Sequence, residues 1–326
     1  DILITDSALL VGRISGYYDY WNNGNLSYSY DIYDLSRQAA PQFATRFEVP
    51  PTVAHGGWGY GMMGCGVDMY WGYWYGSSSA LVDGDLVVSQ HEVPVDGESG
   101  SVSYYLDRLD VSDPYHPELL PAVNIPGQVV HFDADAQRAV TVNFQRHEVT
   151  AKDWNDCYGQ GYSVWFDERA KVCTVYDRQV NVLSIGQDRA TRISQLKLDD
   201  DRITTTIGVT SERVFYLTRP RGTMDMIADE RLESLAFAST GHLQRLPPLG
   251  VEAGAEWYWG TNLQARGTRA FMQRPGTMLV AQTKNKLAPT LTTHELPGWG
   301  CSSLEVGSAQ AFCAANQFGV VSIPLD

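Results

Sequence analysis

The feature that most constrains the fold is the stretch from 109 to 127, LDVSDPYHPELLPAVNIPG, because weaker copies of it recur along the chain. Leu109 and Val111 are spaced as on a half-buried strand, and an Asp-Pro step ends that strand. A second apolar run follows and ends at Pro126-Gly127. The stretch therefore predicts two strands joined by a turn.

Copies of this unit lie on both sides of it. The copy at 32–50, IYDLSRQAAPQFATRFEVP, keeps the same separation of 14 residues between its two strand positions. Looser copies occupy 182–198, 232–248 and 278–298, and a shortened one occupies 320–326. The repeats are spaced by 76, 74, 52, 44 and 42 residues when they are anchored on Leu35, Val111, Ile185, Phe237, Ala281 and Ile323. The three shorter spacings are typical of a four-stranded propeller blade, which takes roughly 40 to 50 residues.

These repeats predict an all-β fold, a β-propeller of four-stranded antiparallel blades in one domain, 1–326. Six blades are preferred, and a seventh hidden in an insertion is the alternative. The predicted repeats are about 1–51, 52–127, 128–200, 201–250, 251–298 and 299–326, with insertions at about 54–76 and 147–165. The last repeat lacks its outer strand, so we expect the N-terminal residues 2–5 to supply it and to close the ring.

Composition agrees with many short strands and excludes some classes of partner. The chain of 326 residues is 44% hydrophobic and 19% charged, and it contains 18 Tyr, 9 Trp and 30 Gly. Its net charge of −14 would repel a phosphate backbone, so nucleic acid is not an expected partner. No apolar run approaches the roughly 18 residues of a spanning helix. Because the chain begins at Asp1 with no Met or signal sequence, we expect a mature form or an excised fragment.

Five cysteines indicate the redox compartment. Cys301 and Cys313 flank a hairpin expected to turn at Gly307-Ser308, which would place them directly across from each other. Cys157 and Cys173 enclose the insertion of the third repeat. Two disulfides would favour an oxidising compartment, and four separate buried thiols are the alternative. Cys65 is the fifth cysteine.

The unit D-[LV]-S-D-P-x-x-P…[IV]-P-G resembles the repeat of secreted bacterial β-propeller proteins of the LVIVD type. The match is close at 109–127, moderate at 32–50, and through spacing alone elsewhere. The resemblance implies export and an extracellular, cell-surface or periplasmic location. It implies a blade and no chemistry, because one fold serves many functions.

Aromatic residues are the strongest candidates for recognition. Tyr and Trp alternate with Gly across 54–76, so large flat rings stand on permissive backbone. Trp-Gly pairs also precede three hairpins, where a propeller links one blade to the next. The predicted partner-binding residues are Trp58, Tyr60, Tyr70, Trp71, Trp74, Trp259 and Trp299. Their expected ligand is a protein partner or a glycan, and an inward-folded cap that plugs the channel is the alternative for 54–76.

Metal and cofactor sites are weakly indicated. Four residues within 55–65 are ligands of the kind that take Cu(I): His55, Met62, Met63 and Cys65. Methionine is more often core filler, so no metal is predicted. Acidic turns at 133–135 and 199–201 lack the ligand spacing of a calcium loop. No cofactor is expected.

Catalytic motifs are missing from the linear sequence. The chain contains no G-x-S-x-G, no H-E-x-x-H and no Walker loop, and no catalytic residue is predicted. The favoured hypothesis is a non-catalytic exported propeller that binds a protein or glycan through an aromatic channel rim. One alternative is a hydrolase or lyase with its site in the channel, since a propeller can assemble a site from distant blades. Another is a structural subunit of a larger cell-surface assembly.

Overall fold

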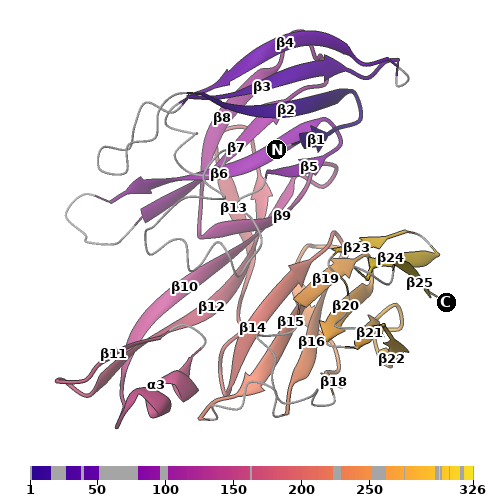
Figure 1. Cartoon of the computed structure of the whole chain (residues 1–326). Coiled ribbons are helices and arrows are strands. Elements are labelled where there is room, and N and C mark those ends of the chain that lie inside the picture. The colour runs from indigo at the N-terminus through magenta and orange to yellow at the C-terminus, as the bar shows by residue number, and fades with distance from the viewer. Residues whose placement is uncertain are drawn as a thin grey trace. The chain divides into compact units, whose positions relative to one another are not determined.

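The computed structural model describes residues 2–15, 27–37, 40–50, 80–95, 102–161, 164–222, 229–251, 262–274, 276–297, 301, 303–307, 309–315 and 319–325. Within these ranges the chain forms six antiparallel sheets and one short helix (Figure 1). The predicted class, all-β with six antiparallel propeller blades, is confirmed.

Each sheet lies within the residues of one predicted repeat. The first sheet contains β1 (Ile2–Ile4), β2 (Ala8–Ser15), β3 (Ser27–Asp34) and β4 (Gln42–Val49). The second contains β5 (Leu81–Asp83), β6 (Leu86–Pro94), β7 (Val102–Asp110) and β8 (Glu118–Ile125). The third contains β9 (Gln128–Asp133), β10 (Arg138–Thr150), β12 (Val172–Ile185) and β13 (Ala190–Lys197), with β11 (Val164–Asp167) paired to β12.

The remaining three sheets follow in chain order. The fourth contains β14 (Arg202–Val209), β15 (Arg213–Pro220) and β16 (Arg231–Phe237), with β17 (Leu243–Arg245) and β18 (Leu249–Gly250) both paired to β16. The fifth contains β19 (Asn262–Arg266), β20 (Arg269–Arg274), β21 (Thr277–Gln282) and β22 (Thr290–Glu295). The sixth contains β23 (Ser303–Val306), β24 (Gln310–Ala314) and β25 (Val320–Pro324).

One backbone hydrogen bond recurs in all six sheets and gives the repeat a structural meaning. At the end of the third strand, a backbone N–H donates to the carbonyl of the turn that precedes the second strand. The donor and acceptor pairs are Leu35 and Ser7, Val111 and Asp85, Ile185 and Gln137, Phe237 and Glu212, Thr283 and Thr268, and Leu325 and Ala309. Four of the six sequence anchors are these donors. The anchors Ala281 and Ile323 lie two residues before the donors Thr283 and Leu325. A shift of two residues leaves an anchor on the same face of its strand, but not at the hydrogen-bonded turn.

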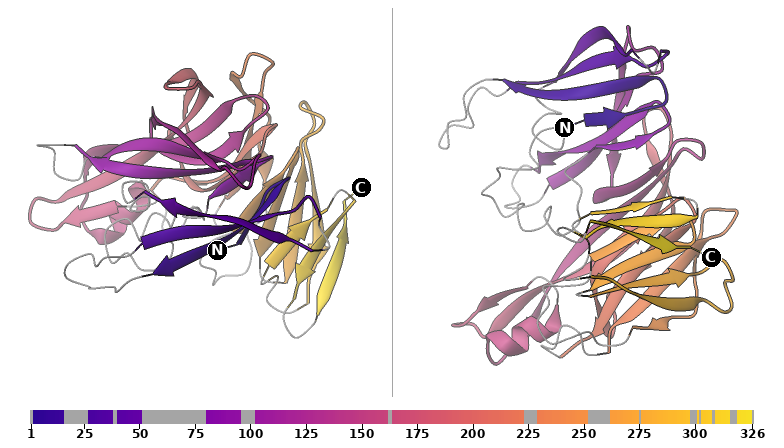
Figure 2. Two further views of the ribbon diagram at one scale, coloured as in Figure 1. Left: turned by 90° about the horizontal axis from the view of Figure 1, so that it is seen from above. Right: turned by 45° about the vertical axis from the view of Figure 1, so that its right-hand side comes forward.

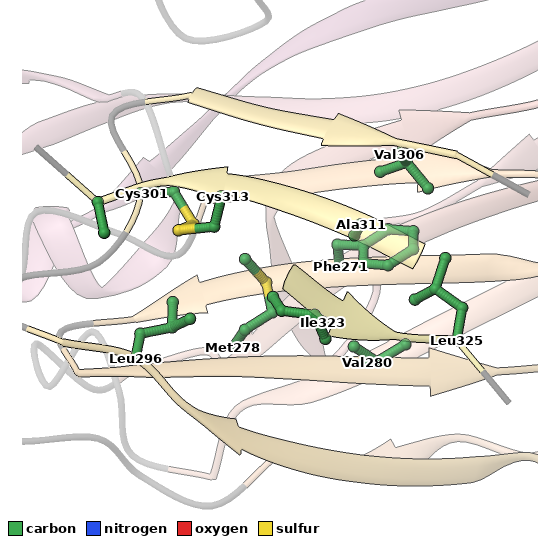
Figure 3. Packing of buried hydrophobic residues seen from close by; sticks show 11 residues of the cluster. Phe271, Met278, Val280, Leu296, Cys301, Val306, Ala311, Cys313, Ile323 and Leu325 are labelled. Carbon is green, nitrogen blue, oxygen red and sulfur yellow. A yellow bond between two sulfur atoms is a disulfide. The ribbon is translucent and has the colours of Figure 1, made fainter. Parts of the chain in front are cut away.

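The chain divides into two compact units. One comprises Asp1–Asn143 and Asn181–Ile193, and the other comprises Phe144–Val180 and Ser194–Asp326. Each has apolar cores of its own, made by the alternating inward residues of neighbouring strands. Figure 3 shows one of them in the second unit, where Phe271 and Met278 pack with Cys313 and Ile323. The single domain over 1–326 stays a prediction.

The sixth sheet corrects two details of the sequence analysis. The N-terminal strand β1 pairs with β2, with Ile2 opposite Val11, so the expectation that it completes the sixth sheet is wrong. The disulfide between Cys301 and Cys313 is present, but the two residues do not oppose each other in the hairpin. Leu304 lies opposite Cys313, so Cys301 reaches its partner from the segment that precedes β23.

Strand order decides which connections share an end of each sheet. Because successive strands are antiparallel, the connection from the second to the third strand and the one from the fourth strand to the next sheet leave from the same end. The tight turns between first and second and between third and fourth strands lie at the opposite end. The strands can be followed from two further sides in Figure 2. The long insertions of the sequence all fall at the first of these two ends.

Candidate binding surface on the insertion of the third sheet

The predicted aromatic residues and the four residues of the Cu(I)-ligand type lie outside the described residues. These are Trp58, Tyr60, Tyr70, Trp71, Trp74, Trp259 and Trp299, and His55, Met62, Met63 and Cys65. In chain order, all seven aromatic residues fall between the fourth strand of one sheet and the first strand of the next. β19 begins three residues after Trp259 and β23 four residues after Trp299, whereas β5 begins seven residues after Trp74. The distance from the tryptophan to the next described strand therefore differs among the three pairs.

The second predicted insertion occupies residues 151–171, which the structure describes except for 162 and 163. The predicted bounds were about 147–165, but β10 continues as strand to Thr150 and β12 begins at Val172. These are the two longest strands in the described residues, 13 and 14 residues, and the insertion joins the end of β10 to the start of β12 (Figure 1). The insertion contains β11 and the helix α3 (Trp154–Gln160), which the sequence analysis did not predict.

A disulfide ties the helix to the strand beneath it. Cys157 of α3 is bonded to Cys173 of β12, and both cysteines are completely buried. They form a small apolar cluster with Ala151 and Val175, against which Phe166 packs. The predicted pairing is confirmed. A segment of 21 residues with so small a core needs such a link, because its burial alone would stabilise it weakly.

The first turn of α3 is closed by reciprocal capping. The carboxylate of Asp153 accepts a hydrogen bond from the backbone N–H of Asp156 at 2.9 Å. The carboxylate of Asp156 accepts one in return from the backbone N–H of Lys152, also at 2.9 Å. The arrangement is similar to a capping box with Asp at both positions, except that the second bond comes from Lys152, the residue before the N-cap. The D-x-x-D spacing is a sequence signal that could have predicted where the helix begins.

Two arginines hold the other end of α3 against the fourth sheet. Arg219 of β15 is fully buried, and it donates to the carbonyls of Tyr158 and Gly161 at 3.3 and 3.4 Å. Arg221 donates to the carbonyl of Gln160, and the backbone N–H of Gly222 donates to Gly159 at 2.8 Å. Carbonyls at a helix C-terminus lack intrahelical partners, so these donors both satisfy them and fix the position of the helix.

Asp177 of β12 extends this anchor. Its carboxylate lies 2.6 Å from Arg221 Nη2 and 2.9 Å from Lys197 Nζ, with His147 Nδ1 at 3.7 Å. Burial alone would raise the pKa of Asp177, but the hydrogen bonds from Arg221 and Lys197 lower it below its ordinary value. The carboxylate is therefore ionised at neutral pH, and it orients the arginine that holds α3.

The insertion exposes two tryptophans. Trp154 of α3 is 50% exposed and Trp165 of β11 is 70% exposed. The ring of Trp154 meets Phe166 edge to face, with centroids 6.4 Å apart, and Lys171 Nζ lies 5.6 Å from the centre of the Phe166 ring. Because neighbouring strand residues point to opposite faces, Trp165 lies on the other face of β11 from Phe166. The insertion thus presents one aromatic surface on each of its faces.

The second sheet contains a buried polar cluster around His91 and Asp107. His91 Nδ1 lies 2.7 Å from Asp107 Oδ2, and the His91 ring stacks on Tyr105 with centroids 5.2 Å apart. Ser89 lies opposite Asp107 in the register, and no described atom accepts or donates a hydrogen bond at its hydroxyl. Burial raises the pKa of Asp107, and the His91 hydrogen bond partly opposes this rise. Since Ser89 does not contact His91, the cluster is not assembled as a nucleophile with its base.

The described residues contain no group of three or more His, Cys, Asp or Glu side chains placed to hold a metal ion. Among the same residues, no helix has the length and apolar character needed to cross a membrane.

Comparison with known proteins finds similar solved structures. No family model matches the chain, and no curated protein matches it. The chain is similar to PorZ, a structure titled as an essential bacterial surface component of the type-IX secretion system of Porphyromonas gingivalis, with 12% identity and a TM-score of 0.40. The match covers 100% of this chain and 36% of that one. The likeness is too low to support an argument, so the fold assignment depends on the six sheets themselves.

Proposed function

We propose that this protein is an exported, non-catalytic binding module. It recognises a protein partner or a glycan through aromatic side chains at one end of its sheets, the end that carries the 2–3 connections and the links between sheets. The observation that carries the proposal is the insertion at 151–171, which exposes Trp154 and Trp165 on a segment fixed at both ends.

Exposed tryptophan on a rigid segment is suited to binding. Each ring keeps a large apolar area in contact with water, and burial of that area on binding would be favourable. Little conformational entropy would be lost, because the disulfide and the arginines already hold α3 in place. The predicted aromatic residues of 54–76 and of the Trp-Gly pairs lie outside the described residues and remain further candidates for recognition.

Two disulfides support an extracellular, cell-surface or periplasmic location. Each bond joins two cysteines of the same repeat, and all four cysteines are buried. Disulfides persist in oxidising compartments and are rare in the reducing cytosol. Proteins and glycans of the cell envelope are therefore the partners available to this surface.

The test compares a variant at the insertion with one at the opposite end of a sheet. The double variant Trp154→Ala/Trp165→Ala removes both exposed rings. Leu287→Ala is the matched control, because Leu287 is 88% exposed and lies in the turn between β21 and β22. Both proteins are applied to a glycan array and to an array of purified envelope proteins. We expect the double variant to lose the signals of the native protein and the control to keep them. Unchanged signals for the double variant would contradict the proposal.

A further inference from the structure

We propose that the face of the insertion formed by Trp154, Phe166 and Lys171 binds an acidic glycan. A sugar ring would stack on Trp154, and its carboxylate would pair with Lys171. The inference depends on the proposed function for its surface and adds the chemical class of the ligand.

The first argument is charge. The chain carries −14 overall, yet the insertion has three exposed basic side chains, Lys152, Arg169 and Lys171. Within the described part of the chain none of the three forms an ion pair, whereas 14 ion pairs join other residues. Three of the four acidic side chains between 151 and 173 accept backbone hydrogen bonds: Asp153, Asp156 and Asp167. These carboxylates stay charged, so the insertion carries three basic and four acidic side chains. Lys171, however, has no carboxylate partner among the described residues, and its ammonium is available to an anionic ligand.

The second argument is the backbone of Lys171. Its φ is +56°, a conformation that glycine adopts without strain and that a side chain with a Cβ adopts at a cost. The carbonyl of Lys171 accepts a hydrogen bond from the backbone N–H of Ala151 at 3.1 Å, and this bond closes the base of the insertion. Glycine would serve that turn equally well. A lysine in its place extends over Phe166, the same ring that Trp154 contacts, and strain of this kind often marks a functional position.

A sugar suits this surface better than an acidic peptide. An extended peptide gains much of its affinity by pairing with a strand edge, and the edge offered here, β11, is only 4 residues long. A pyranose ring needs one aromatic face and a few polar donors. Trp154 meets Phe166 in a T-shaped contact, and half of its surface is exposed, while Lys171 supplies a point charge for a carboxylate.

The experiment is a titration followed by tryptophan fluorescence and by calorimetry. The probes are oligosaccharides of galacturonate, of mannuronate and of hyaluronan, together with methyl-esterified oligogalacturonate and hexaglutamate. The variants are Trp154→Ala and Lys171→Gly, and Lys171→Gly also relieves the strained φ. Matched controls are Leu287→Ala, in the turn between β21 and β22, and Gln137→Gly, which relieves a comparable φ of +46° in the turn between β9 and β10.

We expect at least one of the three acidic oligosaccharides to bind, with an affinity that falls as salt is added. Trp154→Ala should weaken binding about tenfold and Lys171→Gly about fivefold, with both controls within about twofold of the native protein. The methyl ester should bind less tightly than the acid. The inference is overturned if no acidic sugar binds, if ester and acid bind equally, if hexaglutamate binds in their place, or if Leu287→Ala weakens binding as much as Trp154→Ala. The proposed function survives each of these results if the double tryptophan variant still loses the array signals that the native protein gives.

Discussion

Substitution of Gly127 by alanine gives the sharpest test of how consecutive sheets pack. Gly127 follows Pro126 in the link between β8 and β9, and its φ is +84°. An added Cβ would lie 2.3 Å from the carbonyl oxygen of Val142 and 2.8 Å from the Cα of Asn143. Both are backbone atoms of β10, so no side-chain rotation can relieve the overlap. Hydrogen bonds from Thr141 and Asn181 to the carbonyl of Pro126 hold the link close to that strand.

The expected cost has two parts. The positive φ costs a residue with a Cβ about 1–2 kcal/mol. Forcing β10 away from the link adds about 1–3 kcal/mol, the range for overpacking of a well-packed interior. Gly84 separates the two parts, because its φ is +58° and the nearest atom to an added Cβ is the Asp6 carboxylate at 3.9 Å. Gly84→Ala should therefore cost only the first part, about 1–2 kcal/mol.

Urea unfolding at 25 °C, with the free energy of unfolding extrapolated to water, measures both variants against the native protein. Gly84 and Gly127 belong to the same compact unit, so one transition reports on both. We expect Gly127→Ala to be the less stable variant by at least about 1 kcal/mol. Equal losses for the two variants would refute the close approach of the link to β10.

Three further predictions follow from contacts in the second unit. Removing the Cys157–Cys173 disulfide by Cys157→Ala/Cys173→Ala, which opens a link of sequence separation 16, should destabilise the insertion by roughly 3 kcal/mol. Hydrogen exchange should then show faster exchange in α3 and unchanged exchange in β19 to β22. The lowered pKa of Asp177 means that its contribution to stability is complete above its ordinary value of 3.8 and is lost as pH falls through the lower folded-state value. Acid titration of the Trp154 fluorescence should therefore show a transition below pH 3.8 that Asp177→Asn abolishes, and a transition that persists in this variant would contradict the role of Asp177. Arg274→Met should cost about 3–5 kcal/mol, because it leaves the Glu230 carboxylate buried without the arginine now 2.6 Å away, and Arg274→Met/Glu230→Leu should recover much of that loss in thermal unfolding.

Most of the fold could be predicted from the sequence because each repeat is short and its strands pair with neighbours along the chain. Period-two alternation placed the strands, and similarity to the unit at 109–127 placed Leu35, Val111, Ile185 and Phe237 at one recurring hydrogen bond. The same alternation could not distinguish Ala281 from Thr283, since residues two apart point to the same face of a strand. Turn chemistry identified the hairpins, including the one at Gly84, whose positive φ requires glycine.

The insertion could be predicted only in part. Its cysteines indicated the disulfide, but a helix of 7 residues is too short to show a helical period in sequence. Its position depends on Arg219 and Arg221, which lie about 60 residues away along the chain. Such contacts between distant residues carry no local signal. The exposure of Trp154 and Trp165 follows from the same long-range packing, so sequence reasoning placed the recognition site only in the other aromatic segments.

The central claim is that the disulfide-linked insertion is a recognition surface. Hydrogen exchange of the native protein, measured with and without the ligand that the arrays identify, tests this claim most directly. We expect binding to protect residues 151–161 and 164–173 and to leave the turn at 283–289 unchanged. Protection confined to 283–289, or to other turns at the opposite end of the sheets, with no change in the insertion, would contradict the claim.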